Sequence, residues 1–187
     1  MDTLFDTFKA RAEAVSAEVH RFATRREAMD FILGLLQEQG VLDAPQAGAL
    51  WADGAFLKGT GRKYLEAEAP GISFQVTREA AAAARVGISE VDWAVAATGT
   101  LVVDAAPVEQ RLVSTLPPIH VALVGTARLR EDLGAVLQRI HPGKTAYISL
   151  ITGPSRTADI ERVLTIGVHG PERLIVVFVD EFERETA

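Results

Sequence analysis

The chain has 187 residues, of which 48% are hydrophobic and 24% charged, a balance typical of one globular domain with a full core. Its net charge of −6 disfavours nucleic-acid binding, which depends on a basic surface. No apolar run approaches the roughly 18 residues of a membrane-spanning helix, so we expect no membrane span. The acidic start, Met1 to Asp6, argues against a signal peptide and predicts a cytoplasmic location.

Cysteine is absent from the chain. The chain therefore has no thiolates to offer to zinc or to an ordinary iron–sulfur cluster. The four histidines include no close pair of the H-x-x-x-H kind. We therefore expect no metal or cofactor in this chain, and we expect any iron–sulfur clusters to lie on partner proteins.

An N-terminal helical segment is predicted at about residues 1–42. Apolar residues recur at helical spacing over residues 3–22. A capping box from Thr24 to Glu27 then opens a second helix, which Gly40 is suited to end. No residue in these two helices is a candidate for catalysis or ligand binding. We expect them to pack on the domain or on a second copy, which predicts self-association or pairing with another protein.

Residues 41–71 give a weaker pattern, with a short strand at Val41–Leu42 and a short helix from Asp43 to Leu50. The loop Lys58–Tyr64 then combines two glycines with three cations. This composition resembles a phosphate-binding loop, although the full P-loop spacing is absent. A solvated loop is the alternative interpretation.

From residue 72 the chain alternates between strand and helix patterns. The expected strands are 72–76, 93–97, 101–104, 120–124, 145–150 and 174–179, the expected helices are 78–85, 127–140 and 157–164, and 105–118 is expected to be a loop. The strands on either side of Gly99 should form a hairpin. The pattern predicts an α/β fold of three layers, with a mostly parallel or mixed sheet and helices on both faces. We find no linker that would divide residues 1–187 into separate domains.

The segment after the strand at 145–150 is the strongest candidate for a functional site. Gly153 and Pro154 stop the strand, and five polar groups follow within a few residues. The clearest of these are the hydroxyls of Ser155 and Thr157 and the carboxylates of Asp159 and Glu161. A crevice between a strand end and a helix start is where α/β proteins place their sites, and the free N–H groups there attract anions. The alternative is a simple helix cap at Thr157 with acids in the first turn.

Further candidates come from other turns and from charged residues in apolar surroundings. The turn Thr98-Gly99-Thr100 should meet Gly153 in one pocket, if the strands before them are parallel neighbours. Arg111 can hold a carboxylate or phosphate with two hydrogen bonds. His120 and His169 are candidates to line the site, with structural roles as the alternative.

Four segments of the chain are informative as an ordered set: Asp92 to Leu101, Leu116 to His120, Thr152 to Glu161, and Gly167 to Pro171. Together they resemble the LUD domain family, and most closely its lactate-utilisation protein C group. The resemblance covers about residues 72–180. It implies a fold similar to ribose-5-phosphate isomerase, glucosamine-6-phosphate deaminase and CoA transferases. It also implies a cytoplasmic role in oxidising L-lactate to pyruvate beside two partner proteins, one of them resembling an iron–sulfur oxidoreductase.

Three functional hypotheses remain open. In the first, the chain is an accessory or ligand-binding subunit of a lactate-oxidising system. In the second, it is an enzyme of the sugar-phosphate isomerase or CoA-transferase type. It would act on a small anionic ligand, an organic acid or phosphate ester, with Asp159 or Glu161 as base or nucleophile. In the third, the motifs only stabilise the fold or an oligomer.

Overall fold

The computed structural model describes residues 2–42, 48–58, 61–141, 143–160, 163–166 and 170–182, with side chains except at 61, 68, 157–160 and 163–166. The helices are α1 (Asp2–Ala14), α2 (Arg25–Glu38), η1 (Ala55–Leu57), α3 (Gly61–Glu68), α4 (Arg78–Ala83), α5 (Val108–Thr115), η2 (Thr126–Arg128) and α6 (Leu133–Leu137). The strands are β1 (Glu18–Phe22), β2 (Ala49–Trp51), β3 (Ile72–Ser73), β4 (Val86–Glu90), β5 (Trp93–Val95), β6 (Thr100–Asp104), β7 (Ile119–Gly125), β8 (Leu129–Arg130), β9 (Ile148–Ile151), β10 (Arg156–Ile160), β11 (Val163–Ile166) and β12 (Arg173–Val179).

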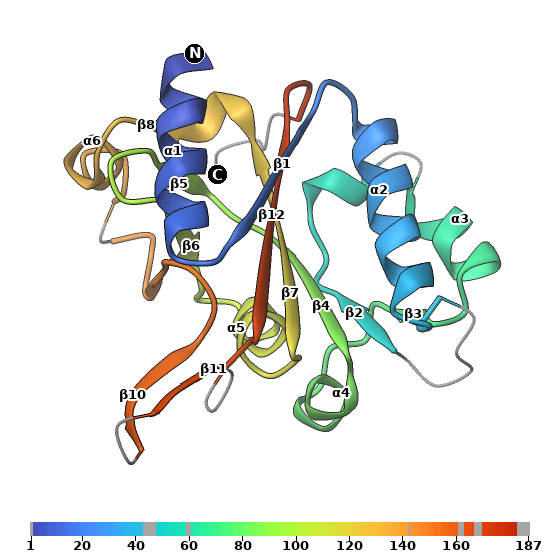
Figure 1. Ribbon diagram of the computed structural model, residues 1–187. Helices are drawn as coiled ribbons and strands as arrows, with labels where there is room; N and C mark the ends of the chain where they lie inside the picture. Colours follow the sequence, from blue (N-terminus) through green and yellow to red (C-terminus); the bar gives the residue numbers. More distant parts are fainter. Residues whose placement is uncertain are drawn as a thin grey trace.

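A six-stranded sheet in the order β1-β12-β7-β4-β2-β3 forms the centre of the molecule (Figure 1). Every pairing in it is parallel. The neighbouring inner strands β12 and β7 are apolar and buried almost throughout. Such continuous apolar runs are typical of parallel strands covered on both faces. The predicted α/β class with a mostly parallel or mixed sheet is therefore confirmed.

Alternate residues of the central strands supply two separate cores. Val121 and Leu123 of β7 face a core built with α2, α3 and η1. Ala122 and Val124 face the opposite core, built with α1 and the strands β5 and β6. The two-residue period of a strand produces this division, since successive side chains point to opposite faces. Figure 1 shows α2 and α3 on one side of the sheet and α1 with the smaller sheet on the other.

A second sheet, in the order β8-β5-β6-β9, lies over this second core. β5 and β6 form the expected antiparallel hairpin, and β9 pairs antiparallel with β6. Beyond β9 the chain forms a two-stranded antiparallel hairpin, β10–β11, which extends away from the body of the molecule (Figure 1). This hairpin corrects our prediction of a helix at 157–164. Its β-branched residues favour a strand over a helix.

Other element predictions were also wrong. The helix expected over 3–22 ends at Ala14, because Ser16 takes a φ of 69° and β1 then pairs with β12. The helix expected at 127–140 is a short 3-10 turn, strand β8 and α6, which Asp132 caps through the Ala135 N–H. The expected loop at 105–118 contains α5, which begins directly after Pro107. Pro107 is the N-cap residue of this helix, with an extended ψ of 128°.

The remaining differences lie between residues 41 and 97. The strand expected at 72–76 is only two residues long, Val41–Leu42 is not a strand, and β4 was missed entirely. The short helix expected at 43–50 lies mostly outside the described residues, and its last two residues belong to β2. The caps of α2 by Thr24 and of α4 by Thr77 were predicted correctly. In the described ranges no helix is long and apolar enough to cross a membrane.

Candidate functional site

The two predicted turns meet through a row of three threonine hydroxyls. Thr100 Oγ1 lies 2.7 Å from Thr98 Oγ1 and 2.8 Å from Thr152 Oγ1, both hydrogen-bonding distances. Thr100 is buried, while Thr98 and Thr152 are exposed. The strands before the two turns belong to one sheet, but β6 lies between them, so they are not neighbours as we had expected. The turns nevertheless lie at the same end of that sheet.

The glycines of both turns pack against the C-terminal end of α1. Gly99 and Gly153 have φ values of 66° and 76°, a region that favours glycine. A Cβ atom on Gly99 would lie 2.5 Å from the backbone nitrogen of Ala12, and one on Gly153 would lie 2.7 Å from the Val15 oxygen. The end of α1 therefore occupies the space directly beside these glycines. This close packing gives both residues a structural role in holding α1.

The segment after Gly153 is tied to its surroundings by hydrogen bonds. Pro154 is buried, and the Ser155 N–H donates to the Pro171 carbonyl at 2.8 Å. Arg156 donates from Nη2 to the Ser16 hydroxyl at 2.7 Å. These bonds join the segment to Ser16, two residues beyond α1, and to the chain that leads into β12. They support the interpretation that the motif fixes α1 and β12 relative to each other.

The expected helix N-terminus at Thr157 does not exist, since residues 156–160 form strand β10. Thr157 therefore caps no helix, and no helix dipole acts on Asp159. The side chains of Thr157 and Asp159 lie outside the described residues, as do Glu161 and His169 altogether. Their predicted roles at a site stay predictions.

Arg111 lies apart from the threonine row. Its Nη1 donates to the carbonyls of Ala105 and Ala106, and its guanidinium lies 5.3 Å from the centroid of the Tyr147 ring. These contacts join α5 to the loop before it and to the segment before β9. The side chain therefore holds the chain around the start of α5.

His120 is fully buried near the start of β7. Its Nε2 lies 2.8 Å from the Ser89 hydroxyl, while Nδ1 has no hydrogen-bond partner among the described residues. Burial lowers the pKa of His120 to about 4, so the ring is neutral at neutral pH. In this position the histidine is part of the packed interior of the sheet.

The sequence interpretation missed a polar group at the carboxyl edge of the large sheet. Glu90, the last residue of β4, is completely buried, and its Oε1 accepts the Phe56 N–H at 2.6 Å. A Cβ atom on Gly54 would lie only 2.1 Å from the same oxygen, so the chain passes very close to this carboxylate. Gln110 of α5 is 6% exposed, and its Nε2 donates to the Asp53 carbonyl at 3.5 Å. Glu90 and Gln110 thus both lie against the Asp53–Gly54 segment.

One pattern in the sequence could have predicted that Glu90 ends a buried strand. Val86 and Ile88 alternate with smaller residues up to Glu90, which is the pattern of a strand that ends in a carboxylate. Our expected elements left these residues between the helix at 78–85 and the strand at 93–97. The carboxyl edge of a parallel sheet is where open α/β folds bind ligands, so Glu90 and Gln110 are stronger site candidates than the threonine row.

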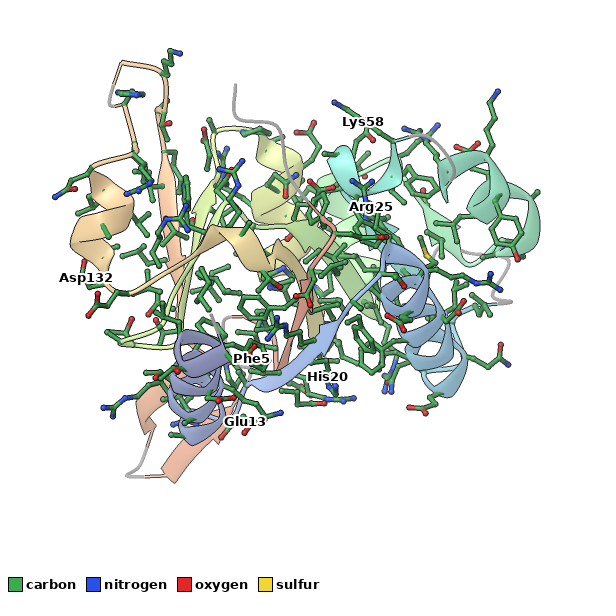
Figure 2. The ribbon with its side chains drawn as sticks, turned by 90° about the horizontal axis from the view of Figure 1, so that it is seen from above. Phe5, Glu13, His20, Arg25, Lys58 and Asp132 are labelled. Carbon is green, nitrogen blue, oxygen red and sulfur yellow. The ribbon has the colours of Figure 1, made fainter. Side chains whose placement is uncertain are left out.

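Basic residues also lie at this edge, on which Figure 2 looks down. Arg25 donates to the carbonyls of Ala55 and Phe56, and its guanidinium lies 5.2 Å from the centroid of the Phe182 ring. Lys58, which follows η1, is exposed and has no ion pair with a described residue. Figure 2 shows both cations beside η1. Positive charge therefore lies beside η1, within an edge that also carries the carboxylates of Asp2, Asp180 and Glu181.

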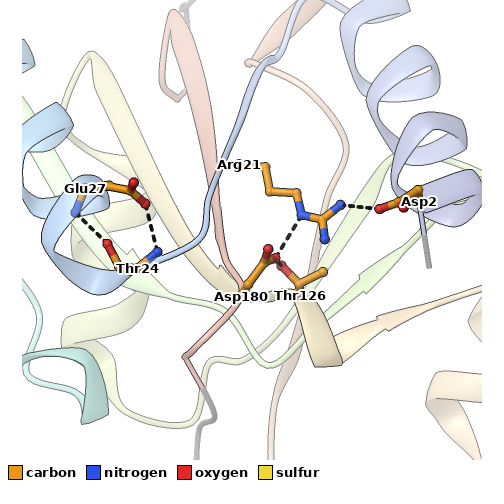
Figure 3. A network of polar contacts seen from close by, with 6 residues as sticks. All are labelled: Asp2, Arg21, Thr24, Glu27, Thr126 and Asp180. Atoms are coloured by element: carbon orange, nitrogen blue, oxygen red, sulfur yellow. Dashed lines mark hydrogen bonds and ion pairs between the residues drawn. The ribbon is translucent and has the colours of Figure 1, made fainter.

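A separate network at the same edge fixes α1 to the central strands (Figure 3). Arg21 donates to Asp180 at 2.8 Å and to Asp2 at 2.9 Å, and Thr126 donates to Asp180 at 2.6 Å. Burial opposes ionisation of Asp180, but the hydrogen bonds from Arg21 and Thr126 outweigh it and lower the pKa of this carboxyl. These groups satisfy one another, which indicates a structural role. Among the described residues, no group of three or more histidine, aspartate or glutamate side chains is placed to hold a metal.

Comparisons with known proteins identify relatives over different parts of the chain. A lactate utilization protein C from an Exiguobacterium species is 35% identical over 113 residues, which cover 57% of this chain and 49% of that protein. The corresponding protein of Macrococcus caseolyticus is 36% identical over 105 residues, covering 52% of this chain and 45% of that protein. An uncharacterized protein of Neisseria meningitidis serogroup B is 33% identical over 96 residues, covering 50% and 41%. The chain thus spans less than half the length of these relatives.

Two further comparisons extend over nearly the whole chain. The crystal structure of a DUF162 family protein from Deinococcus radiodurans has the same fold, with a TM-score of 0.62 over 95% of this chain and 97% of that chain, at 14% identity. The model of the LUD domain matches residues 5–179, which include all the strands and most of helix α1. The match therefore includes the N-terminal region, in which the sequence alone carried little resemblance. The chain belongs to the LUD domain family.

Proposed function

We propose that this chain is a component of a system that uses L-lactate, in which it acts as an accessory or ligand-binding subunit. The observation that carries the proposal is its similarity to lactate utilization protein C of several bacteria, at 32–36% identity. A cytoplasmic location is part of the same proposal.

The composition of the chain supports the assignment of electron transfer to other proteins of such a system. Oxidation of lactate to pyruvate releases two electrons, which a redox centre must accept. A chain without cysteine does not provide the thiolates that hold ordinary iron–sulfur clusters. We therefore assign the electron transfer to iron–sulfur partner proteins and assign to this chain the binding of a small organic acid or the docking of those partners.

Growth of a deletion strain tests the proposal directly. A strain without this gene should lose growth on L-lactate as the carbon source and retain growth on pyruvate, which enters metabolism after the oxidation step. A plasmid copy of the gene should restore growth on L-lactate. A tagged copy should also copurify proteins that contain iron–sulfur clusters. Unimpaired growth of the deletion strain on L-lactate would overturn the proposal.

The carboxyl edge supports a second candidate function, an enzyme acting on a small anionic substrate. A completely buried carboxylate at this edge, Glu90, has the position of a general base in an open α/β fold. Incubation of the purified protein with L-lactate, sugar phosphates and CoA esters tests this function. Turnover that is lost in Glu90→Gln but retained in Asp159→Asn and Glu161→Gln would support Glu90 as the base. The opposite pattern would favour the two carboxylates expected from the sequence.

A further inference from the structure

The strand β9 forms an open edge of the smaller sheet. Among the described strands it pairs with β6 alone, and its residues Ile148 and Leu150 are exposed, Leu150 by 53%. Both side chains point to the outer face of the sheet, because Ile151, on the alternate face, packs on the core beneath it. Beside Leu150 on the outer face, Val102 of β6 is buried in a cluster with α6. β9 therefore extends an apolar surface beyond the part that α6 covers.

The backbone groups of Ile148 and Leu150 also point to the open side. The Ala105 N–H donates to the Tyr147 carbonyl at 2.9 Å, which makes these two residues a hydrogen-bonded pair that continues the β6–β9 register. In an antiparallel ladder such pairs alternate with pairs that are not hydrogen-bonded. Ile148 and Leu150 therefore direct their N–H and C=O groups away from β6, and they form no bond outside the ladder within the described ranges.

The other edge strands of the two larger sheets have features that prevent pairing with a further strand. β3 and β8 are two residues long, and β1 contains the charged residues Glu18 and Arg21. Short length and charge are common protections of sheet edges. The sequence from Thr145 to Pro154 has no charged residue, so β9 lacks both protections. An exposed, apolar and uncharged edge of this kind is a surface for another strand.

A second copy of β9 is complementary to this edge. When two copies pair antiparallel about a two-fold axis at Ser149, Ile148 of each copy lies opposite Leu150 of the other. The outward backbone groups of these residues then bond to each other, and their exposed side chains cover each other on one face. The chain has a net charge of −6, so two copies repel in general, but β9 brings no charge to this contact. A two-fold contact also closes on itself, which limits the assembly to a dimer.

We propose that the chain forms a symmetric dimer through β9, which joins the smaller sheets of two copies into one continuous sheet. This surface differs from the two N-terminal helices, from which the sequence predicted self-association. Those helices, α1 and α2, bury their apolar residues in the two cores of the central sheet. The exposed apolar residues of β9 have no such cover among the described residues.

Sedimentation velocity of the purified protein between about 1 and 100 µM tests the dimer, since small interfaces bind in this range. We expect the wild type to be dimeric at the upper end. Leu150→Lys should be monomeric throughout, because its charge would enter the apolar contact. Leu137→Lys is the matched control, since Leu137 lies on α6 and is 51% exposed. It should dimerise like the wild type.

A cysteine at Ser149 tests the register of the two strands. The Cα atoms of two Ser149 residues on the axis should lie about 4.5 Å apart, within reach of a disulfide. Because the chain has no cysteine of its own, mild oxidation of Ser149→Cys should link two copies, which non-reducing electrophoresis detects. Leu150→Cys is the control, since its Cα atoms would be about 9 Å apart, beyond that reach. It should remain largely unlinked.

Three results would each overturn the contact: a monomeric wild type, a Leu150→Lys variant that still dimerises, or a linked fraction no greater for Ser149→Cys than for Leu150→Cys. A monomeric wild type that binds another protein through β9 would replace the second copy with that partner and would equally overturn the dimer.

Discussion

The buried histidine His120 should make the stability of this protein sensitive to acid. In the folded protein the ring stays neutral down to pH values near its pKa of about 4, because burial disfavours the charged form. In the unfolded chain the ring titrates near its ordinary pKa of 6.5. Between these two values the unfolded chain binds more protons than the folded one, so the free energy of unfolding falls as the pH falls.

The size of this effect follows from the two pKa values. The full loss, reached below pH 4, is about 3 kcal/mol, since each pKa unit is worth about 1.4 kcal/mol. Most of it falls within an accessible range, with about 2 kcal/mol lost between pH 7 and pH 5. A loss of that size is a large part of the stability of a typical domain, about 5–15 kcal/mol.

Urea unfolding of the wild type and of His120→Gln at pH 7, 6 and 5 measures the effect. Glutamine keeps a polar group opposite Ser89 but does not titrate. The variant should be less stable than the wild type at pH 7, and the difference should shrink by about 2 kcal/mol at pH 5. Carboxylates titrate in both proteins, so their contribution cancels in the difference.

Ser89→Ala provides the control for this experiment. It removes the hydroxyl that lies 2.8 Å from the ring but leaves the titrating histidine in place. It should lower stability by about 1 kcal/mol and retain the full dependence on pH. A stability difference between the wild type and His120→Gln that stays constant from pH 7 to pH 5 would refute the reasoning.

Three further predictions concern stability and can be measured by urea unfolding at neutral pH. Gly99→Ala and Gly153→Ala should each cost about 1–3 kcal/mol, because each combines a positive φ with a clash against the end of α1. Gly34→Ala is their control and should stabilise by about 0.5–1 kcal/mol, since Gly34 lies inside α2 with no atom within 4 Å of an added Cβ. Losses below about 0.5 kcal/mol at Gly99 and Gly153 would show that α1 does not depend on these turns. Thr24→Ala should cost about 1 kcal/mol through loss of the α2 capping box, and an unchanged midpoint would contradict this. Arg21→Ala should cost less than about 1 kcal/mol and less still in high salt, since its partners Asp2 and Asp180 are exposed, and a larger loss would reveal a stronger network.

The sequence by itself determined the features that depend on neighbouring residues. The capping box at Thr24 and Glu27 and the cap at Thr77 identified two helix starts, since a cap joins residues only three positions apart. The run from Leu174 to Val179 identified a buried strand by its apolar character alone. The α/β class followed from the alternation of such runs with helix patterns, and the ordered motifs were enough to suggest the family.

Only the tertiary structure decided which distant segments meet and what each motif holds. β1 is a strand because it pairs with β12, about 157 residues further along the chain, although its apolar spacing also suits a helix. The two glycine turns looked like a ligand site, but α1 lies against them. Glu90 and Gln110, 20 positions apart, come together only around the Asp53–Gly54 segment. A local sequence pattern reflects the relation of a residue to the residues next to it along the chain. The burial of Glu90 or His120 depends on helices and strands that are distant in the sequence. A short stretch of sequence does not include those elements and cannot predict the burial.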